Sequence, residues 1–254
     1  MNRTIVIANQ KGGVGKTTTA INLAASLAAR KRRTLLVDMD PQGNASSGFD
    51  LQVEEGTKNI YDIMLGEARI EEAIIRDVRP RLSVIPSDVN LAACEIQLSD
   101  AENRNEILKT ELNRVRENYE FIIIDCPPSL NILTLNAMCA GNTVLVPLQC
   151  EYYALEGLAQ LMKTVKLISE RMNPDLVIEG IVFTMYDSRT NLANQVVENV
   201  EQNTDKKIYK CIIPRNVRLA EAPSYGMPIT EYDPKSAGAK AYDQLAKKVI
   251  SYRR

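Results

Sequence analysis

The chain has 254 residues, of which 45% are hydrophobic and 25% charged, and its formal net charge is −1. This length suffices for one large domain, and the composition is that of an ordinary globular protein rather than a disordered or fibrous one. The absence of histidine excludes Ser-His-Asp and Cys-His catalysis and histidine-ligated metals. Five cysteines without a CxxC spacing favour a reduced, cytoplasmic protein over a disulfide framework or a zinc site.

The net charge conceals an uneven distribution. From Lys206 onward, eleven Lys or Arg side chains stand against four acidic ones, a charge of +7, whereas residues 1–205 carry −8. A basic end of this kind is typical of a surface that faces a polyanion, and equally of a solvated helix face. No run of eighteen apolar residues occurs and the N-terminus leads straight into an apolar run, so we expect neither a transmembrane helix nor a signal peptide.

Apolar runs alternate with helical patterns along the whole chain. Near-continuous rather than alternating hydrophobicity predicts strands that are covered on both faces, and therefore a parallel sheet. Apolar side chains three and four apart predict helices between these strands, and two short helices, 60–65 and 70–75, in a region without clean strand character. The predicted strands are 5–8, 34–37, 82–85, 121–124, 144–148, 178–184 and 208–213.

This alternation predicts a single α/β domain over residues 1–254, with a doubly wound, mostly parallel sheet and helices on both faces. Helical stripes are clearest over 19–28, 108–115, 155–168 and 242–252. In such a fold the ligand binds at the carboxyl ends of the strands. Ligand-binding and catalytic residues are therefore expected directly after each apolar run.

The first such place reads KGGVGKTT, between the first predicted strand and the first predicted helix. Strand, glycine-rich loop and helix form the context of a phosphate-binding loop, in which backbone N–H groups and the helix N-terminus bind an anion. Lys16 is placed to reach the terminal phosphates, and the Thr17 hydroxyl to ligate Mg²⁺. The predicted nucleotide-binding residues of this loop are Lys11, Gly12, Gly13, Val14, Gly15, Lys16, Thr17 and Thr18.

The loop departs from the general pattern G-x-x-x-x-G-K-[ST] in two ways. Gln10 occupies the position of the first glycine, and a second lysine, Lys11, lies inside the loop. One lysine is enough for the phosphates of a single site. Lys11 can therefore either fold back on its own nucleotide or project across an interface to the nucleotide of a partner.

Carboxylates follow two other apolar runs. Asp38 and Asp40 end the second run and, two residues apart in extended chain, lie on the same side. One can hold the Mg²⁺ water shell and the other can orient the attacking water, although Asp-Pro and Gln-Gly pairs are also ordinary turn chemistry. Asp125 ends the run 121–124 and is predicted to hold Mg²⁺ through water. The next helix is capped by Ser129 or Asn131.

The variant loop resembles the deviant Walker A signature of the ParA/MinD family of P-loop ATPases. The resemblance extends through most of the chain and is best to the small chromosomal ParA type. It implies that Lys16 is the phosphate lysine and that Lys11 is the signature lysine, which crosses a dimer interface. It also implies that Asp40 is the hydrolytic carboxylate, with Asp38 in a supporting role beside the metal.

The resemblance further implies roles for four residues of the second half. Pro214 and Asn216 would contact the adenine, and the basic residues Arg189 and Arg218 would bind DNA without reading its sequence. The expected cofactors are ATP and Mg²⁺. The expected partners are non-specific double-stranded DNA, a ParB-type centromere-binding protein and a second copy of the chain in an ATP-dependent homodimer, in the cytoplasm on nucleoid DNA.

Three other functions remain open at this point. A MinD-like membrane switch would need an amphipathic C-terminal helix, but the tail 245–254 has no Trp or Phe and continues a stripe that looks core-facing, which favours DNA over a membrane. An iron-protein relative would need paired cluster cysteines. A binding module without turnover is disfavoured by Asp40.

Overall fold

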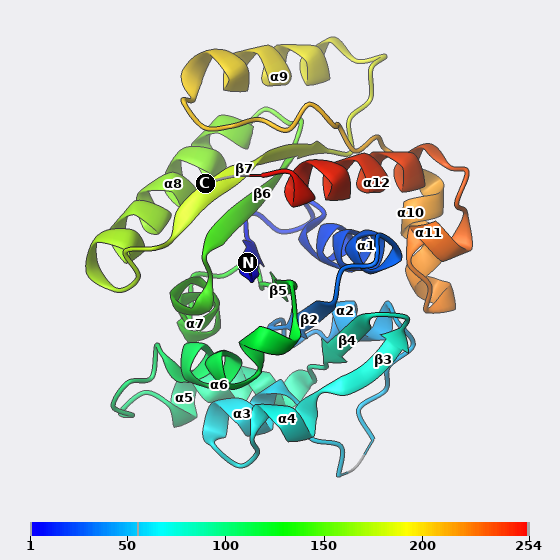
Figure 1. Ribbon diagram of the computed structural model, residues 1–254. Coiled ribbons are helices and arrows are strands. Elements are labelled where there is room, and N and C mark those ends of the chain that lie inside the picture. The colour runs from blue at the N-terminus through cyan, green and yellow to red at the C-terminus, as the bar shows by residue number, and fades with distance from the viewer. Residues whose placement is uncertain (1, 55, 253–254) are drawn as a thin grey trace.

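The computed structural model describes residues 2–54 and 56–252, and its strands form one seven-stranded sheet in the order β3-β4-β2-β5-β1-β6-β7 (Figure 1). Six strands are parallel, and β3 pairs antiparallel with β4 at one edge. The α/β prediction is thus confirmed. The strands are β1 (Arg3–Ile7), β2 (Thr34–Asp38), β3 (Ile75–Arg79), β4 (Leu82–Ile85), β5 (Phe121–Asp125), β6 (Thr143–Gln149) and β7 (Val177–Thr184).

Helices cover both faces of the sheet, which is why its strands are apolar throughout. Side chains of β1 alternate between the layers: Val6 packs in the layer of α7 and α8, whereas Ile5 and Ile7 pack in the layer of α1 and α12. The helices are α1 (Lys16–Ala29), α2 (Asn44–Ser47), α3 (Ile60–Leu65), α4 (Ile70–Ala73), α5 (Cys94–Gln97), α6 (Ile107–Val115), α7 (Ile132–Ala140), α8 (Ala154–Arg171), α9 (Asn191–Asn203), α10 (Val217–Glu221), α11 (Ile229–Tyr232) and α12 (Ala237–Ile250).

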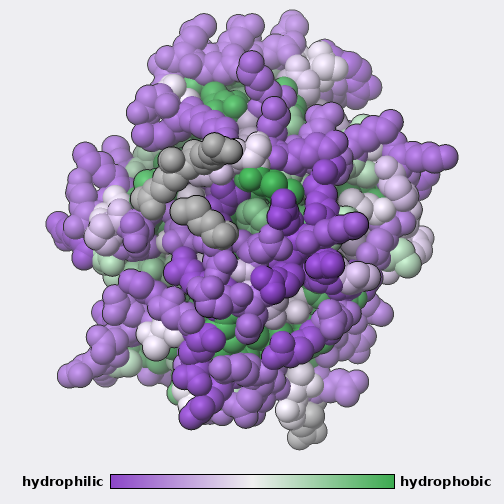
Figure 2. All heavy atoms as spheres, viewed as in Figure 1, coloured by the Kyte–Doolittle hydropathy of each residue, from purple (hydrophilic) through white to green (hydrophobic). Residues whose placement is uncertain are grey.

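The face of the molecule drawn in Figure 2 is mostly hydrophilic. In the view of Figure 2, hydrophobic residues show only in small, separated patches. Among the described residues, no helix is both long and apolar enough to cross a membrane. The predicted tail is described as far as Tyr252, and Arg253 and Arg254 lie outside the described residues.

The strand predicted over 208–213 is wrong. This segment runs beside β7, where Tyr209 N–H donates to the carbonyl of Ile181 over 2.8 Å and Ile213 N–H donates to that of Phe183 over 2.8 Å. The chain bends at Lys210 between these two bonds, so only isolated bridges form instead of a ladder. Tyr209, Cys211 and Ile213 are buried, and Ile208 and Ile212 are half-buried, because the segment covers the core, which produced the strand-like run.

The short helix predicted over 60–65 is confirmed as α3, but the second one, predicted over 70–75, ends at Ala73. Ile75 instead begins β3, a strand that the sequence did not reveal. β3 lies at the edge of the sheet, and three of its five residues are charged. An edge strand facing solvent needs no continuous apolar run, so hydrophobicity alone could not find it.

A set of polar contacts ties α1 to the C-terminal elements. The Asn22 side chain donates to the carbonyl of Thr18 over 2.8 Å and accepts from the N–H of Ile229 over 2.7 Å. The Thr19 hydroxyl lies 3.2 Å from that of Tyr242 on α12. The helix that begins at the glycine-rich loop is therefore fastened directly to α11 and α12.

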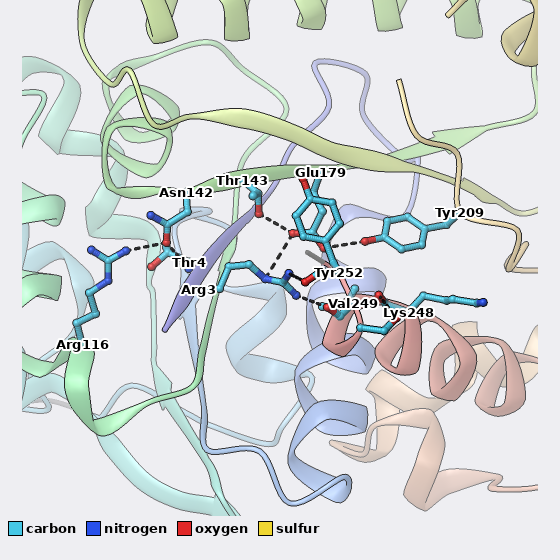
Figure 3. A network of polar contacts seen from close by, with 11 residues as sticks. Arg3, Thr4, Arg116, Asn142, Thr143, Glu179, Tyr209, Lys248, Val249 and Tyr252 are labelled. Atoms are coloured by element: carbon cyan, nitrogen blue, oxygen red, sulfur yellow. Dashed lines mark hydrogen bonds and ion pairs between the residues drawn. The ribbon is translucent and has the colours of Figure 1, made fainter. Parts of the chain in front are cut away.

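A buried charge cluster joins the first strand to the last helix (Figure 3). Glu179 on β7 is fully buried and accepts hydrogen bonds from Thr143 over 2.6 Å and from the Tyr209 hydroxyl over 2.7 Å. The Arg3 guanidinium lies 3.7 Å from the same carboxylate and also donates to the carbonyl of Val249. Burial, followed by the charge of Glu179, raises the pKa of Tyr209, so its hydroxyl stays protonated and remains a donor.

We expect Glu179→Ala to lower the free energy of unfolding by at least about 3 kcal/mol, because it leaves the mostly buried Arg3 and two hydroxyls without their acceptor. Urea unfolding followed by circular dichroism measures the change. Glu198→Ala, on the exposed side of α9, is the control and is expected to change the value by less than about 0.5 kcal/mol. Equal stability of the two variants would contradict the role given to this cluster.

Candidate nucleotide-binding site

The register of the sheet brings three loops to one place. Ile7 of β1 and Asp38 of β2 both lie opposite Asp125 of the central strand β5. Because these strands are parallel and end together, the loops that follow them meet at the carboxyl edge. They form a cleft of about 620 Å³, lined by the glycine-rich loop, by Asp40 and Gln42 after β2, and by residues 127–129 after β5.

The glycine-rich loop has the conformation that phosphate binding requires. Gly13 and Gly15 have φ of 74° and 86°, a left-handed backbone that favours glycine, and Gly15 is the N-cap of α1. A Cβ placed on Gly12 or Gly13 would meet no atom within 4 Å, so their backbone faces open space. Val14 is buried instead, and its carbonyl accepts a 2.8 Å hydrogen bond from Thr184 at the end of β7. That anchor was not foreseen.

Lys16 lies inside the cleft, with only 6% of its surface exposed. Its ammonium donates to the carbonyl of Lys11 over 2.9 Å. Burial lowers the pKa of Lys16, while the charges of Asp125 and Asp40 oppose this shift. A buried ammonium that faces carboxylates and one carbonyl is well placed to gain from a phosphate. Thr17 and Thr18 line the same cleft.

Asp125 is the most deeply placed acid of the site. It is fully buried, and no described residue donates a hydrogen bond of ordinary geometry to either of its oxygens. Burial, followed by the charge of Asp38, raises the pKa of Asp125 well above its ordinary value, although the nearby Thr17 hydroxyl acts to lower this pKa. Such a carboxylate fits a hard cation held through water, with the Thr17 hydroxyl as a second ligand. The described residues hold no cluster of three or more carboxylate or thiol ligands, so phosphates and water would complete the shell.

Asp38 and Asp40 differ in their surroundings, although Asp38 is the last residue of β2 and Asp40 follows two residues later. Asp38 is fully buried, where it accepts hydrogen bonds from the Ser46 N–H and hydroxyl, each over 2.8 Å, and from the Asp40 N–H over 3.2 Å. Burial raises the pKa of Asp38 to about 6. Asp40 lines the cleft, and its carboxylate accepts from the Gln42 N–H over 3.0 Å. Asp38 thus holds the backbone from which Asp40 reaches the cleft, and its role beside the metal stays a prediction.

Lys11 precedes the residues of the loop that line the cleft, and its ammonium forms an ion pair with Glu151, which follows β6. Asn9 fixes the backbone of Lys11 by accepting its N–H over 3.0 Å while donating to the carbonyl of Pro147 over 2.8 Å. Neither Asn9 nor Glu151 was among the predicted site residues. Glu151 is 140 residues away from Lys11 in sequence and belongs to no motif, so the sequence carried no signal for it.

The predicted base-contacting residues lie beside the cleft rather than in its lining. Pro214 forms a bridge with Tyr186, two residues after Thr184, and both Pro214 and Asn216 are half-buried. Asn216 caps α10 by accepting the N–H of Arg218 over 2.8 Å. Their contact with adenine stays a prediction. At the other strand end, Asn131 rather than Ser129 caps α7, by accepting the N–H of Thr134.

Both arginines predicted to bind DNA are exposed and ion-paired. Arg189 donates two hydrogen bonds to the carboxylate of Asp187, over 2.8 and 2.6 Å. Arg218 pairs with Glu221 over 2.9 Å and lies 3.6 Å from Asp233. Exposed pairs of this kind contribute little to stability, so the arginines can exchange their carboxylates for other anions.

The glycine-rich loop, the phosphate lysine and the acid at the end of a central strand together define a P-loop nucleotide-binding protein. Residues 2–178 match the family model described as AAA domain. The chain is 52% identical over 251 residues to the sporulation initiation inhibitor protein Soj of Bacillus subtilis (strain 168), covering 99% of each chain. It is 52% identical over 250 residues to the chromosome partitioning protein ParA of Myxococcus xanthus (strain DK1622), covering 98% of this chain and 88% of that one.

Among solved structures, the septum site-determining protein MinD of Pyrococcus horikoshii OT3, complexed with Mg-ADP, superposes with a TM-score of 0.80. The two chains are 27% identical, and the match covers 99% of this chain and 97% of the MinD chain. The chain therefore belongs to the ParA/MinD family of P-loop ATPases, and stands with its chromosomal ParA members.

Proposed function

We propose that the protein is an ATP-dependent dimeric switch that binds DNA non-specifically and hydrolyses ATP, with slow basal turnover, to drive chromosome or plasmid partitioning with a ParB-type partner. The observation that supports it most is the pair of lysines in one loop. Lys16 is buried in the cleft, whereas Lys11 is half-exposed and paired with Glu151 outside the cleft lining. A single nucleotide needs one such lysine, which leaves the second for the nucleotide of another subunit. The relatives named for chromosome partitioning supply the biological setting.

We infer a part in ATP hydrolysis for side chains in and beside the cleft. Lys16 and the amides of the loop bind the phosphates, and Asp40 holds the attacking water by accepting one of its protons in a hydrogen bond. Thr17 and Asp125 hold Mg²⁺, which, when bound, neutralises charge on the phosphate oxygens. Asp38 keeps Asp40 in place through the N–H of Asp40.

The packing of α12 weighs against the membrane alternative. Its apolar residues Tyr242, Leu245 and Val249 have 1%, 0% and 0% of their surface exposed, because they pack in the layer of α1. A helix that inserts into a membrane interface must present that side to the lipid. In the folded chain these apolar residues of α12 are not exposed for contact with lipid.

DNA binding is proposed for the positive C-terminal third together with Arg189. The whole chain is close to neutral, so attraction to DNA must come from local contacts. One subunit offers few phosphate contacts, but two subunits joined by ATP make the second set intramolecular and raise the avidity. DNA affinity should therefore depend on ATP and should be equal for unrelated duplexes.

We expect Arg189→Ala and Arg218→Ala to weaken DNA binding while ATP binding and dimerisation stay unchanged. Each change removes a contact to a DNA phosphate. It also leaves Asp187 or Glu221 without its arginine, so that this carboxylate repels the DNA phosphates. For wild type, the logarithm of DNA affinity should fall with the logarithm of salt by about 0.9 per neutralised phosphate. In each variant this slope should become shallower by about two per symmetrical dimer, because one phosphate contact is lost from each subunit.

The measurement is a salt titration of DNA affinity with a non-hydrolysed ATP analogue, by fluorescence anisotropy. Arg32→Ala is the matched control, because Arg32 is also ion-paired, with Glu120 over 2.9 Å, but precedes β2 and therefore lies at the amino ends of the parallel strands, away from the cleft. Gel filtration with and without ATP, random DNA and lipid vesicles completes the test. Binding that is insensitive to salt or ATP, or retention of the protein on vesicles, would contradict the proposed function.

A further inference from the structure

The ion pair between Lys11 and Glu151 joins the glycine-rich loop to the loop between β6 and α8. Both side chains are half-exposed, at 39% and 44%. The backbone on each side is fixed. Asn9 fastens Lys11 to β6, while the N–H of Glu151 donates to the carbonyl of Gln149 and its carbonyl accepts from the N–H of Ala154. The contact therefore joins two rigid supports, and only the side chains have to move to break it.

The pair sets where the Lys11 ammonium lies in an isolated subunit. Glu151 draws it to the β6–α8 loop, which bounds a groove of about 450 Å³ between that loop and α9. Lys16, in contrast, remains in the cleft and is bonded to the backbone of Lys11. An ammonium held by Glu151 neither folds back on the nucleotide of its own subunit nor reaches that of another subunit.

We propose that Glu151 is a positioning residue that retains Lys11 on its own subunit until a second, nucleotide-loaded subunit competes for it. This inference rests on the proposed ATP-dependent dimer. An ATP phosphate carries more negative charge than one carboxylate, so it displaces Glu151 when it comes within reach. Two pairs break in a symmetrical dimer. Glu151 thereby opposes dimerisation without preventing it, and raises the protein concentration that is needed for the ATP-dependent dimer to form.

The test compares dimerisation of wild type and Glu151→Gln, which keeps the shape of the side chain and removes its charge. A half-exposed pair contributes about a two- to fivefold factor, and two pairs break, so the apparent Kd of the dimer should fall by about 4- to 25-fold. Sedimentation velocity with a non-hydrolysed ATP analogue measures it. Glu156→Gln is the matched control, because Glu156 is an exposed acid on the same groove that has no contact with Lys11.

Three further readouts separate positioning from a structural role. The advantage of Glu151→Gln should shrink between about 0.1 and 1 M salt, because salt screens the pair that it removes. Glu151→Asp, which keeps the charge, should restore most of the wild-type Kd. In a Lys11→Ala background, which should form no stable dimer, Glu151→Gln should not restore dimerisation, because its effect acts only through Lys11. A structural defect would give none of these patterns.

The possible failures are distinguishable. If wild type does not dimerise with the ATP analogue, the proposed function is wrong. If wild type dimerises and Glu151→Gln has the same or a weaker dimer affinity, the inference about Glu151 is wrong while the proposed function stands. A gain of equal size in Glu156→Gln would also overturn it, because the effect would then come from the general charge of the groove.

Discussion

Lys16→Ala is expected to abolish ATP binding. In the structure this ammonium lies almost fully buried in the cleft, where its neighbours are the charges of Asp125 and Asp40 and the carbonyl of Lys11. A charged hydrogen bond in such a place is worth about 1.5–3 kcal/mol, and two bonds to phosphate oxygens give a loss of at least about 100-fold in affinity. The change also removes the only buried ammonium that balances the acids of the cleft among the described residues.

Equilibrium binding of a fluorescent ATP analogue measures this loss. Lys163→Ala, which removes an exposed lysine of α8, is the control and should bind as wild type does. Far-UV circular dichroism of both variants checks that the fold is kept. Unchanged affinity of Lys16→Ala would mean that the glycine-rich loop is not the phosphate site.

Asp40→Ala is expected to bind ATP and to form longer-lived dimers, while hydrolysis falls by at least about 100-fold. Asp40 lines the cleft, and within the described part of the chain its carboxylate accepts a hydrogen bond only from the N–H of Gln42 in its own loop, so its loss leaves the phosphate-binding loop intact. The attacking water is no longer held, but the contacts that join the subunits remain. Phosphate release and sedimentation with ATP, measured on the same sample, give both results.

Lys11→Ala should give the opposite result in sedimentation with ATP. It should bind ATP with a modest loss and yet fail to form a stable dimer, because the lysine that crosses to the second subunit is missing. Asp205→Ala, which removes an acid whose side chain is 78% exposed, should behave as wild type. A normal ATP dimer of Lys11→Ala would contradict the cross-subunit role, and normal turnover of Asp40→Ala would contradict the role given to that carboxylate.

The parts of the fold that were predictable are those whose chemistry is local. A strand buried on both faces needs a run of apolar residues, so six of the seven strands could be found from hydrophobicity alone. A phosphate-binding loop needs glycines and a lysine at fixed spacing, so the cleft could be located from residues 11–18 and the acids that follow β2 and β5.

The parts that were missed depend on where a segment lies in the finished fold. β3 is an edge strand with charged side chains, and its pairing with β4 is decided by position rather than composition. Residues 208–213 are apolar because they cover the core, not because they form a ladder. Glu151 meets Lys11 only because β6 lies beside β1, which no local pattern records.

The hydrogen bonds of Asn22 have a thermodynamic consequence. This one side chain bonds both to the carbonyl of Thr18, where the phosphates are expected, and to the N–H of Ile229, which begins α11 in the basic third of the chain. If ATP raises the affinity for DNA through this connection, free energies around the closed binding cycle must balance. DNA then raises the affinity for ATP by the same factor, so a subunit already resting on the nucleoid keeps its nucleotide at concentrations where a free subunit loses it.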